Sequence, residues 1–116
     1  MVTRSPYIPD KGDLIWLSFS PQSGHEQSGT RPALVLSPRA YNQKTHLALM
    51  CPVTSKVKGY PFEVTLPVSL SIQGVVLSDQ VKNLDWVERK AVFKTKAPPE
   101  VVNEVKNKIA ALLEMP

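Results

Sequence analysis

Short apolar runs alternate along the chain with polar segments that contain proline or glycine. Runs of this length, bounded by turn residues, are typical of β-strands. Residues 33–36 form a continuous apolar run, as in a strand buried on both faces, and residues 62–66 alternate with the period of two that a half-buried strand requires. The predicted strands are 13–19, 31–37, 47–53, 62–66, 74–78 and 88–97.

Two segments between these strands have a different pattern. Residues 38–45 are mostly polar and begin with a proline, so we predict a turn there. In residues 79–86, the apolar positions Val81, Leu84 and Trp86 fit neither the strand period nor the helix period. We interpret that segment as a turn or a short irregular helix.

The last segment has the pattern of an amphipathic helix. Pro98 and Pro99 stand at its start, and apolar residues recur at helical spacing from Val102 to Leu112. Several short strands closed by one helix predict a mainly β fold, with a small, strongly bent antiparallel sheet or partial barrel. We expect the helix to pack against the sheet or in a subunit interface through Val101, Val102, Val105, Ile109, Leu112 and Leu113.

The composition sets limits on the kind of protein. A chain of 116 residues with 42% apolar content suits one domain, residues 1–116. No window approaches the roughly 20 apolar residues of a membrane span, and the N-terminal residues lack the apolar stretch of a signal peptide. We therefore expect a cytoplasmic protein with no membrane partner. The one cysteine, Cys51, lies in an apolar run, and we expect it to be buried and unreactive.

The formal net charge of +4 favours a polyanion or an acidic protein segment as a partner. Two interpretations of the basic side chains stay open: a track for phosphate groups and a solvated face. The residues concerned are Lys56, Lys58, Lys82, Arg89, Lys90, Lys94 and Lys96.

The polar loop before the second predicted strand carries the clearest chemical signal. Gly24 and Gly29 allow tight turns, so the polar residues between them can face the same point as Arg31. The planar guanidinium of Arg31 can bind two phosphate oxygens at once. The alternative is a structural role, in which Arg31 pairs with Glu26 or Asp13.

The inventory of reactive side chains narrows the possible chemistry. Two histidines and one cysteine match no standard zinc spacing, and the ten acidic residues are scattered singly. The chain has no P-loop, GxGxxG or GxSxG motif, so neither a metal nor a cofactor is expected. Trp16 and Trp86 are interpreted as core or interface residues rather than as platforms for stacked bases.

The remaining polar groups suit a phosphate substrate. RNA can be cleaved without a metal, because its own 2′-hydroxyl is the nucleophile and the protein need supply only a base, an acid and a stabiliser for the charged phosphorus centre. Arg31 fits the stabiliser, and Thr54 with Ser55 in the run CPVTSK offers hydroxyl donors. His25 and Asp79 are both candidates for the base.

Four blocks of the sequence, taken in order, resemble those of one protein family. They are GDLIWLSF, GHEQSGTRPALVLS, CPVTSKVKGYPFEV and GVVLSDQVK, and they cover nearly the whole chain. The resemblance is to the MazF/Kid/PemK family, the toxin endoribonucleases of bacterial toxin–antitoxin pairs. It implies an SH3-like barrel, related to the CcdB gyrase poisons, that forms a homodimer. It also implies sequence-specific, metal-free cleavage of single-stranded RNA that leaves 2′,3′-cyclic phosphate and 5′-hydroxyl ends.

The resemblance further implies roles for individual residues. The family's essential arginine falls on Arg31 and its essential threonine on Thr54, so these are the expected catalytic residues. His25 and Asp79 match positions that the Kid/PemK branch uses for substrate contact and proton transfer. Leu77 stands where that branch has an arginine, as it does in MazF-like members. The expected substrate-binding residues are His25, Glu26, Gln27, Ser55, Lys58, Asp79 and Gln80.

The resemblance also implies a protein partner. This is a cognate, acidic, partly disordered antitoxin of the MazE type, whose tail competes with RNA for the cationic surface. The alternative function, from a different class, is a CcdB-like protein that binds and poisons DNA gyrase without doing chemistry. Such a poison acts through its last residues, whereas we expect the terminal run from Leu112 to Pro116 to pack in the fold.

Overall fold

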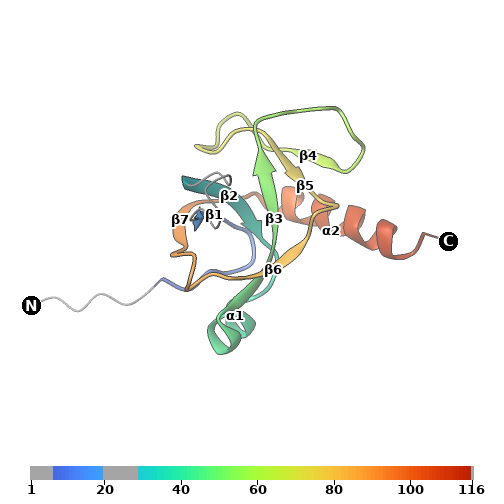
Figure 1. The fold of residues 1–116 in the computed structure, drawn as a ribbon. Helices are drawn as coiled ribbons and strands as arrows, with labels where there is room; N and C mark the ends of the chain where they lie inside the picture. Colours follow the sequence, from blue (N-terminus) through green and yellow to red (C-terminus); the bar gives the residue numbers. More distant parts are fainter. Residues whose placement is uncertain (1–6, 20–28, 116) are drawn as a thin grey trace, which may run out of the picture.

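The computed structural model describes residues 7–19 and 29–115, which form seven strands and two helices (Figure 1). All strand pairings among these residues are antiparallel. The predicted mainly β fold with a C-terminal helix is confirmed. The elements are β1 (Asp13–Phe19), β2 (Gly29–Val35), α1 (Arg39–Thr45), β3 (Leu47–Thr54), β4 (Glu63–Thr65), β5 (Val75–Leu77), β6 (Lys82–Asp85), β7 (Val92–Lys96) and α2 (Pro99–Leu113).

Strand β3 is the centre of the sheet, whose strand order is β4-β5-β3-β2-β1-β7. One edge of β3 pairs with β2. Its other edge is shared: β6 pairs with residues 47–50 and β5 with Val53 and Thr54. The segment that joins β5 to β6 therefore passes beside the last residues of β3. The C-terminal end of β3 thus lies close to β2, β5 and this segment.

Apolar side chains fill both faces of the sheet. Leu14 and Leu34 point into a cluster that includes residues of α2 and β5. Their chain neighbours Ile15 and Val35 point into a second cluster on the opposite face, which contains Trp86. Because successive strand residues point to opposite faces, a continuous apolar run is needed where both faces are covered. The prediction of a doubly buried strand at 33–36 is confirmed for residues 33–35, whereas Leu36 is half-buried and lies just beyond the end of β2. The core position of Trp86 is confirmed.

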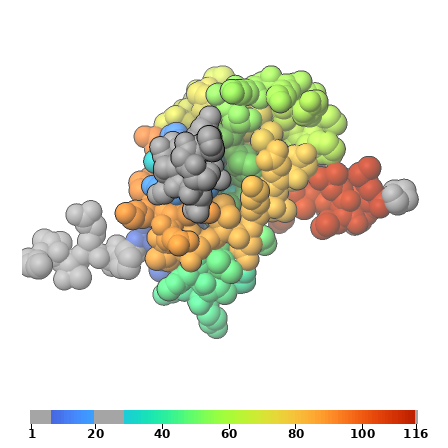
Figure 2. Space-filling view, viewed as in Figure 1, coloured from blue at the N-terminus to red at the C-terminus, as the bar shows by residue number. Residues whose placement is uncertain are grey.

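Helix α2 begins as predicted at Pro99, but only its first half is buried. Val101, Val102 and Val105 are core residues, whereas Leu113 is 81% exposed and Met115 is 65% exposed. The prediction that the terminal run packs in the fold is therefore wrong at these positions. Figures 1 and 2 show the reason: the end of α2 projects beyond the sheet, so no strand lies under it. No helix in the described residues is long and apolar enough to cross a membrane.

The structure corrects three local predictions. Residues 39–45 form the short helix α1 rather than a turn, and it ends at His46 in the left-handed conformation. Residues 82–85, within the segment predicted as a turn or short irregular helix, form strand β6, because they pair with β3. Strand β7 starts at Val92 rather than at residue 88, since the chain turns before it and Lys90 has a φ of 53°.

The N-terminal arm is fastened by two carboxylates. Buried Asp13 accepts hydrogen bonds from the Tyr7 hydroxyl and from Nζ of Lys96, the latter at 2.8 Å. Burial and the hydrogen bond to Asp13 raise the pKa of the Tyr7 hydroxyl. Asp10 in turn accepts the backbone N–H of Arg39 at 2.9 Å. Asp13 is thus bound to Lys96 and Tyr7. It is not the structural partner that the sequence offered for Arg31.

Candidate active site

Arg31 and Thr54 lie on neighbouring strands at the same end of the sheet. Ala33 faces Pro52 in the β2–β3 ladder, and residues two apart on a strand share a face. Arg31 and Thr54 are each two positions beyond that pair, so they lie on the same face. Both line a hollow of about 600 Å³, which we call the central hollow. The central hollow is also lined by Trp16, Ser55, Lys56, Leu77 and Gln80.

Thr54 is held in place from three directions. Its Oγ1 accepts the backbone N–H of Lys56 at 3.1 Å, and its backbone pairs with Val75 of β5. Gly74, with a φ of +122°, lies so close that a Cβ atom there would stand 2.2 Å from the Thr54 carbonyl oxygen. Only glycine allows both that backbone conformation and that approach. The Thr54 backbone therefore has little freedom to move.

A second hollow, of about 220 Å³, shares Thr54 with the central hollow, and we call it the lysine hollow. It extends the surface around Thr54 toward the loop of residues 55–61, which contributes three of its lining side chains. Asp79 is exposed and lines this hollow, while Gln80 lines both hollows. The lysine hollow is lined by Thr54, Lys56, Lys58, Tyr60, Phe62, Glu63, Leu77, Asp79 and Gln80.

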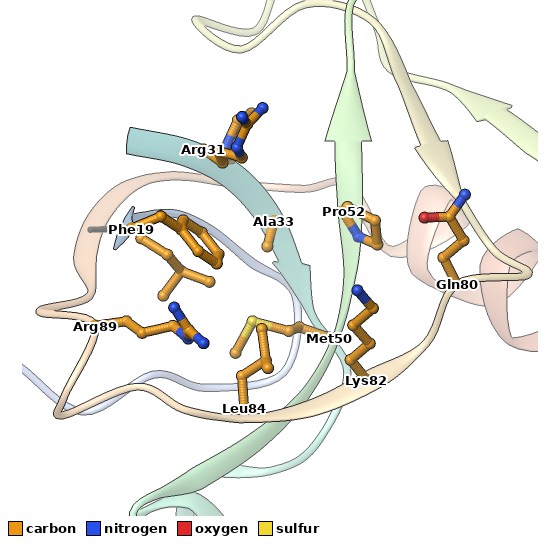
Figure 3. Close-up of a pocket in the computed structure, with 11 residues that line it drawn as sticks. Phe19, Arg31, Ala33, Met50, Pro52, Gln80, Lys82, Leu84 and Arg89 are labelled. Carbon is orange, nitrogen blue, oxygen red and sulfur yellow. The ribbon is translucent and has the colours of Figure 1, made fainter. Parts of the chain in front are cut away.

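A third hollow, of about 310 Å³, shares Arg31 with the central hollow. Figure 3 shows its apolar floor, with Met50 and Leu84 at the base and the guanidinium of Arg89 pointing inward. Arg89 lies over the ring of Phe19, with its guanidinium carbon 4.3 Å from the ring centroid, which is a cation–π contact. Arg31 and Gln80 line both this hollow and the central one, so the three hollows form one continuous surface.

The structure divides the basic side chains that the sequence grouped together. Lys56, Lys58, Lys82 and Arg89 line the hollows, in agreement with a track for phosphate groups. Lys96 does not belong with them, because its ammonium group binds Asp13 and lies near the start of α2. Spacing along the sequence could not separate these two groups, because the position of each basic side chain depends on which strand it joins.

The structure also places the remaining candidates. Trp16 is half-buried and packs against the core cluster of Leu14 and Leu34, in agreement with its interpretation as a core residue. It also lines the central hollow, which that interpretation did not include. His25, Glu26 and Gln27 lie outside the described residues. Within residues 7–19 and 29–115, no three His, Cys, Asp or Glu side chains gather as metal ligands would. Reaction without a metal or cofactor stays a prediction.

Cys51 is fully buried behind the site, as predicted. Burial, and to a lesser extent the charge of Asp79, raise the pKa of its thiol to about 12. The thiolate is the reactive form of cysteine, so the thiol is inert at neutral pH. Cys51 therefore supports the wall of the site and takes no part in chemistry.

Comparison with known proteins identifies the family. Residues 10–113 match the family model of the PemK-like, MazF-like toxin of type II toxin–antitoxin systems. The chain belongs to this toxin family. It is 50% identical to the endoribonuclease toxin MazF of Escherichia coli K12 over 97% of this chain and 99% of the relative. It is 34% identical to the E. coli endoribonuclease PemK, over 90% of this chain and 81% of that protein.

Solved structures of the toxin family share the fold as well. A MazF chain from a MazE–MazF complex of Deinococcus radiodurans superposes with a TM-score of 0.91 at 57% identity, over 96% of this chain and 100% of that one. The sheet with its C-terminal helix is thus the fold of the toxin family. The family match includes every described residue that lines the three hollows.

Proposed function

We propose that this protein is the endoribonuclease toxin of a toxin–antitoxin pair, and that it cuts single-stranded RNA at specific sequences. The observation that carries the proposal is the central hollow, where Arg31 and Thr54 from neighbouring strands face one space beside Gln80. Membership of the toxin family and the similarity to proteins named endoribonuclease support it. We also propose that residues 1–116 form a single domain and that the protein acts in the cytoplasm.

In the proposed mechanism, the substrate's own 2′-hydroxyl attacks the adjacent phosphorus. The guanidinium of Arg31 stabilises the negative charge that builds up on the phosphoryl oxygens, and the hydroxyl of Thr54 holds the scissile phosphate. The bond to the 5′ oxygen breaks as that oxygen takes up a proton, leaving a 2′,3′-cyclic phosphate and a 5′-hydroxyl. No metal is required, because the nucleophile is part of the RNA. His25 and Asp79 are the two candidates for accepting the 2′-hydroxyl proton.

The RNA strand is proposed to follow the continuous surface of the three hollows. Ser55 and Gln80 border the central hollow, and Lys58 and Asp79 border the lysine hollow. Their donors and acceptors suit phosphate oxygens and base edges, which are the features that single-stranded RNA exposes. His25, Glu26 and Gln27 of the first loop complete the proposed set of substrate-binding residues.

An acidic, MazE-like antitoxin is the proposed protein partner, and a homodimer the proposed assembly. The net charge of +4 and the lysines that line the hollows favour an acidic segment on the same surface as RNA. The similar structure from D. radiodurans is a complex of MazF with MazE. An antitoxin bound there would inhibit the toxin by excluding RNA.

The proposal is tested by incubating the purified protein with a long RNA in EDTA and mapping the ends that appear. Discrete cleavage with cyclic phosphate and 5′-hydroxyl ends is expected. The variant Arg31→Ala should lose about 2.7–4 kcal/mol of transition-state stabilisation, as for one lost oxyanion donor, a fall of roughly 10²–10³ in rate. Arg39→Ala, at an exposed arginine of α1, is the matched control and should cut normally.

Two results would overturn the proposal. If RNA stays intact across a pool of many sequences, the proposed enzymatic activity is wrong. If Arg31→Ala keeps full activity, the role assigned to Arg31 is wrong. A supercoiling assay covers the CcdB-like alternative, because inhibition of gyrase without RNA cleavage would favour it. The same end mapping on a transcriptome-scale pool would give the recognition sequence.

A further inference from the structure

The carboxylate of Glu63 faces the backbone of the preceding loop. Glu63 is half-buried at the start of β4 and lines the lysine hollow. Its Oε2 accepts the backbone N–H of Lys58 at 3.1 Å, and its Oε1 accepts the backbone N–H of Gly59 at 3.0 Å. Each carboxylate oxygen therefore holds one of two consecutive amide groups.

The loop has the geometry of an anion-binding turn. Consecutive backbone N–H groups converge on one point where the chain passes into the left-handed conformation, and such a point binds an anion. Gly59 supplies that conformation with a φ of +82°. The anion is the chain's own Glu63 side chain. A Cβ atom at Gly59 would meet nothing within 4 Å, and residues 55–61 are all exposed, so the loop around Gly59 is not buried in the core.

Other contacts fasten the two ends of the loop. At its start, the N–H of Lys56 is bound to Oγ1 of Thr54. At its end, Nζ of Lys108 on α2 donates to the Pro61 carbonyl at 2.7 Å, and the N–H of Glu63 donates to the Tyr60 carbonyl at 3.1 Å. Among the described residues, the Glu63 side chain is the contact that holds the middle of the loop, where Lys58 and Gly59 lie.

The loop carries the side chains that extend the site beyond Thr54. Lys56, Lys58 and Tyr60 are exposed and line the lysine hollow. Exposed lysines have many rotamers, and their reach depends on where their backbone is fixed. A carboxylate on a surface for RNA would repel phosphate groups, but Glu63 directs both of its oxygens to the chain's own amides. Its position is thus explained by the loop rather than by contact with a substrate.

We propose that Glu63 is a positioning residue for RNA recognition. It holds residues 55–61 so that their lysines and Tyr60 bind the RNA beside Thr54. This rests on the proposed endoribonuclease function. Glu63 touches no reacting atom and acts through the loop. It therefore governs how tightly RNA binds and which sequences are cut, and it leaves the rate of the chemical step at Arg31 and Thr54 largely unchanged.

The test compares Glu63→Gln and Glu63→Ala with the wild-type protein on a short RNA that contains one cleavage site. Glu63→Ala removes both acceptors, and Glu63→Gln keeps one. We expect KM to rise about tenfold in Glu63→Ala, the equivalent of one charge-assisted hydrogen bond, and less in Glu63→Gln. The value of kcat should stay within about twofold, and cleavage of an RNA pool should spread to additional sequences. Glu114→Gln, at the exposed end of α2, makes the same charge change as the control.

A second pair of variants tests the loop without touching Glu63. Gly59→Ala strains the left-handed backbone, whereas Gly59→Asn tolerates it better, because asparagine enters that region more readily than alanine. Gly59→Ala should reproduce the rise in KM and the broadened cleavage, and Gly59→Asn should restore most of the wild-type behaviour.

The outcomes separate the two proposals. If the wild-type protein cuts RNA and the Glu63 variants keep its KM and cleavage pattern, the positioning role is refuted and the endoribonuclease function stands. A fall in kcat and thermal midpoint with unchanged KM and pattern refutes it too, because that is the signature of a merely structural residue. If the wild-type protein cuts no RNA, both proposals fail.

Discussion

The close approach of Gly74 to Thr54 makes a prediction whose size follows from the structure. In Gly74→Ala, the new Cβ atom would stand 2.2 Å from the Thr54 carbonyl oxygen and 2.8 Å from its carbon. Cβ atoms essentially never approach another heavy atom closer than 3.0 Å, so the backbones of Gly74 and Thr54 must separate by at least about 0.8 Å. The atoms that move are backbone, so no rotamer change relieves the contact.

Such a shift acts directly on the proposed site. A displacement of about 1 Å in a positioning group costs roughly 100-fold in rate, or about 2.7 kcal/mol in the barrier. Alanine at the Gly74 φ of +122° also adds strain of about 1–3 kcal/mol to the folded state. Gly74→Ala is therefore expected to remain folded at 25 °C, with a lower melting temperature, and to cut RNA about 100 times more slowly.

Single-turnover cleavage of a short RNA, with circular dichroism of the same sample, measures both effects. Gly12→Ala is the matched control: Gly12 also has a positive φ, +94°, but the nearest atom to a Cβ there is 3.5 Å away, outside the three hollows. Gly12→Ala should lose stability and keep its cleavage rate. If a folded Gly74→Ala protein cuts RNA as fast as the wild type, the reasoning that this glycine places Thr54 is wrong.

Two further predictions concern titratable groups. Cys51, whose thiol pKa is raised to about 12 by burial, should resist iodoacetamide at pH 8 in the folded protein and react on unfolding in urea; fast labelling of the native protein would contradict its burial. Burial raises the pKa of Asp10, but hydrogen bonds from the backbone of Arg39 and Lys11 outweigh it, so the pKa lies below its usual value. The stability that Asp10 contributes is thus present above its unfolded pKa of about 3.9 and is lost as pH falls through the folded value. Urea unfolding should show Asp10→Asn less stable than wild type at pH 7 and a smaller difference at pH 2.5; an equal difference at both pH values would exclude this linkage.

Much of the strand pattern was predictable because burial leaves a period in the sequence. Strand β1 was predicted with its observed limits, and the doubly buried run of β2 required continuous apolar residues. Strand β6 escaped prediction because Lys82 and Asn83 are exposed, and the strand forms by pairing with the distant strand β3. Leu47 of β3, for example, pairs with Asp85, 38 residues later in the chain. Helix α1 escaped for a similar reason, since Asn42 is its one buried residue and its side chain donates to the carbonyl of Pro9, 33 residues earlier in the chain.

The candidate site divides in the same way. Arg31 and Thr54 were identifiable from loop composition and from the family resemblance, whereas the contribution of Trp16 to the central hollow was not. Trp16 has the same apolar signal whether it lies in a core or beside a cavity, so its role depends on what packs around it. Lys96 likewise forms its ion pair with Asp13 only because β7 pairs with β1, which the sequence did not predict.

By itself, the sequence determined which segments could be strands, which side chains could bind a phosphate, and the family to which these blocks are similar. These properties are local, because they depend on side-chain chemistry and on short periods of the backbone. The tertiary structure decided that Arg31 and Thr54 share a hollow, that Gly74 presses on Thr54, and that Glu63 holds the loop around Lys58. Each of these depends on the register between strands, which is set by the packing of the whole sheet rather than by neighbours in the chain.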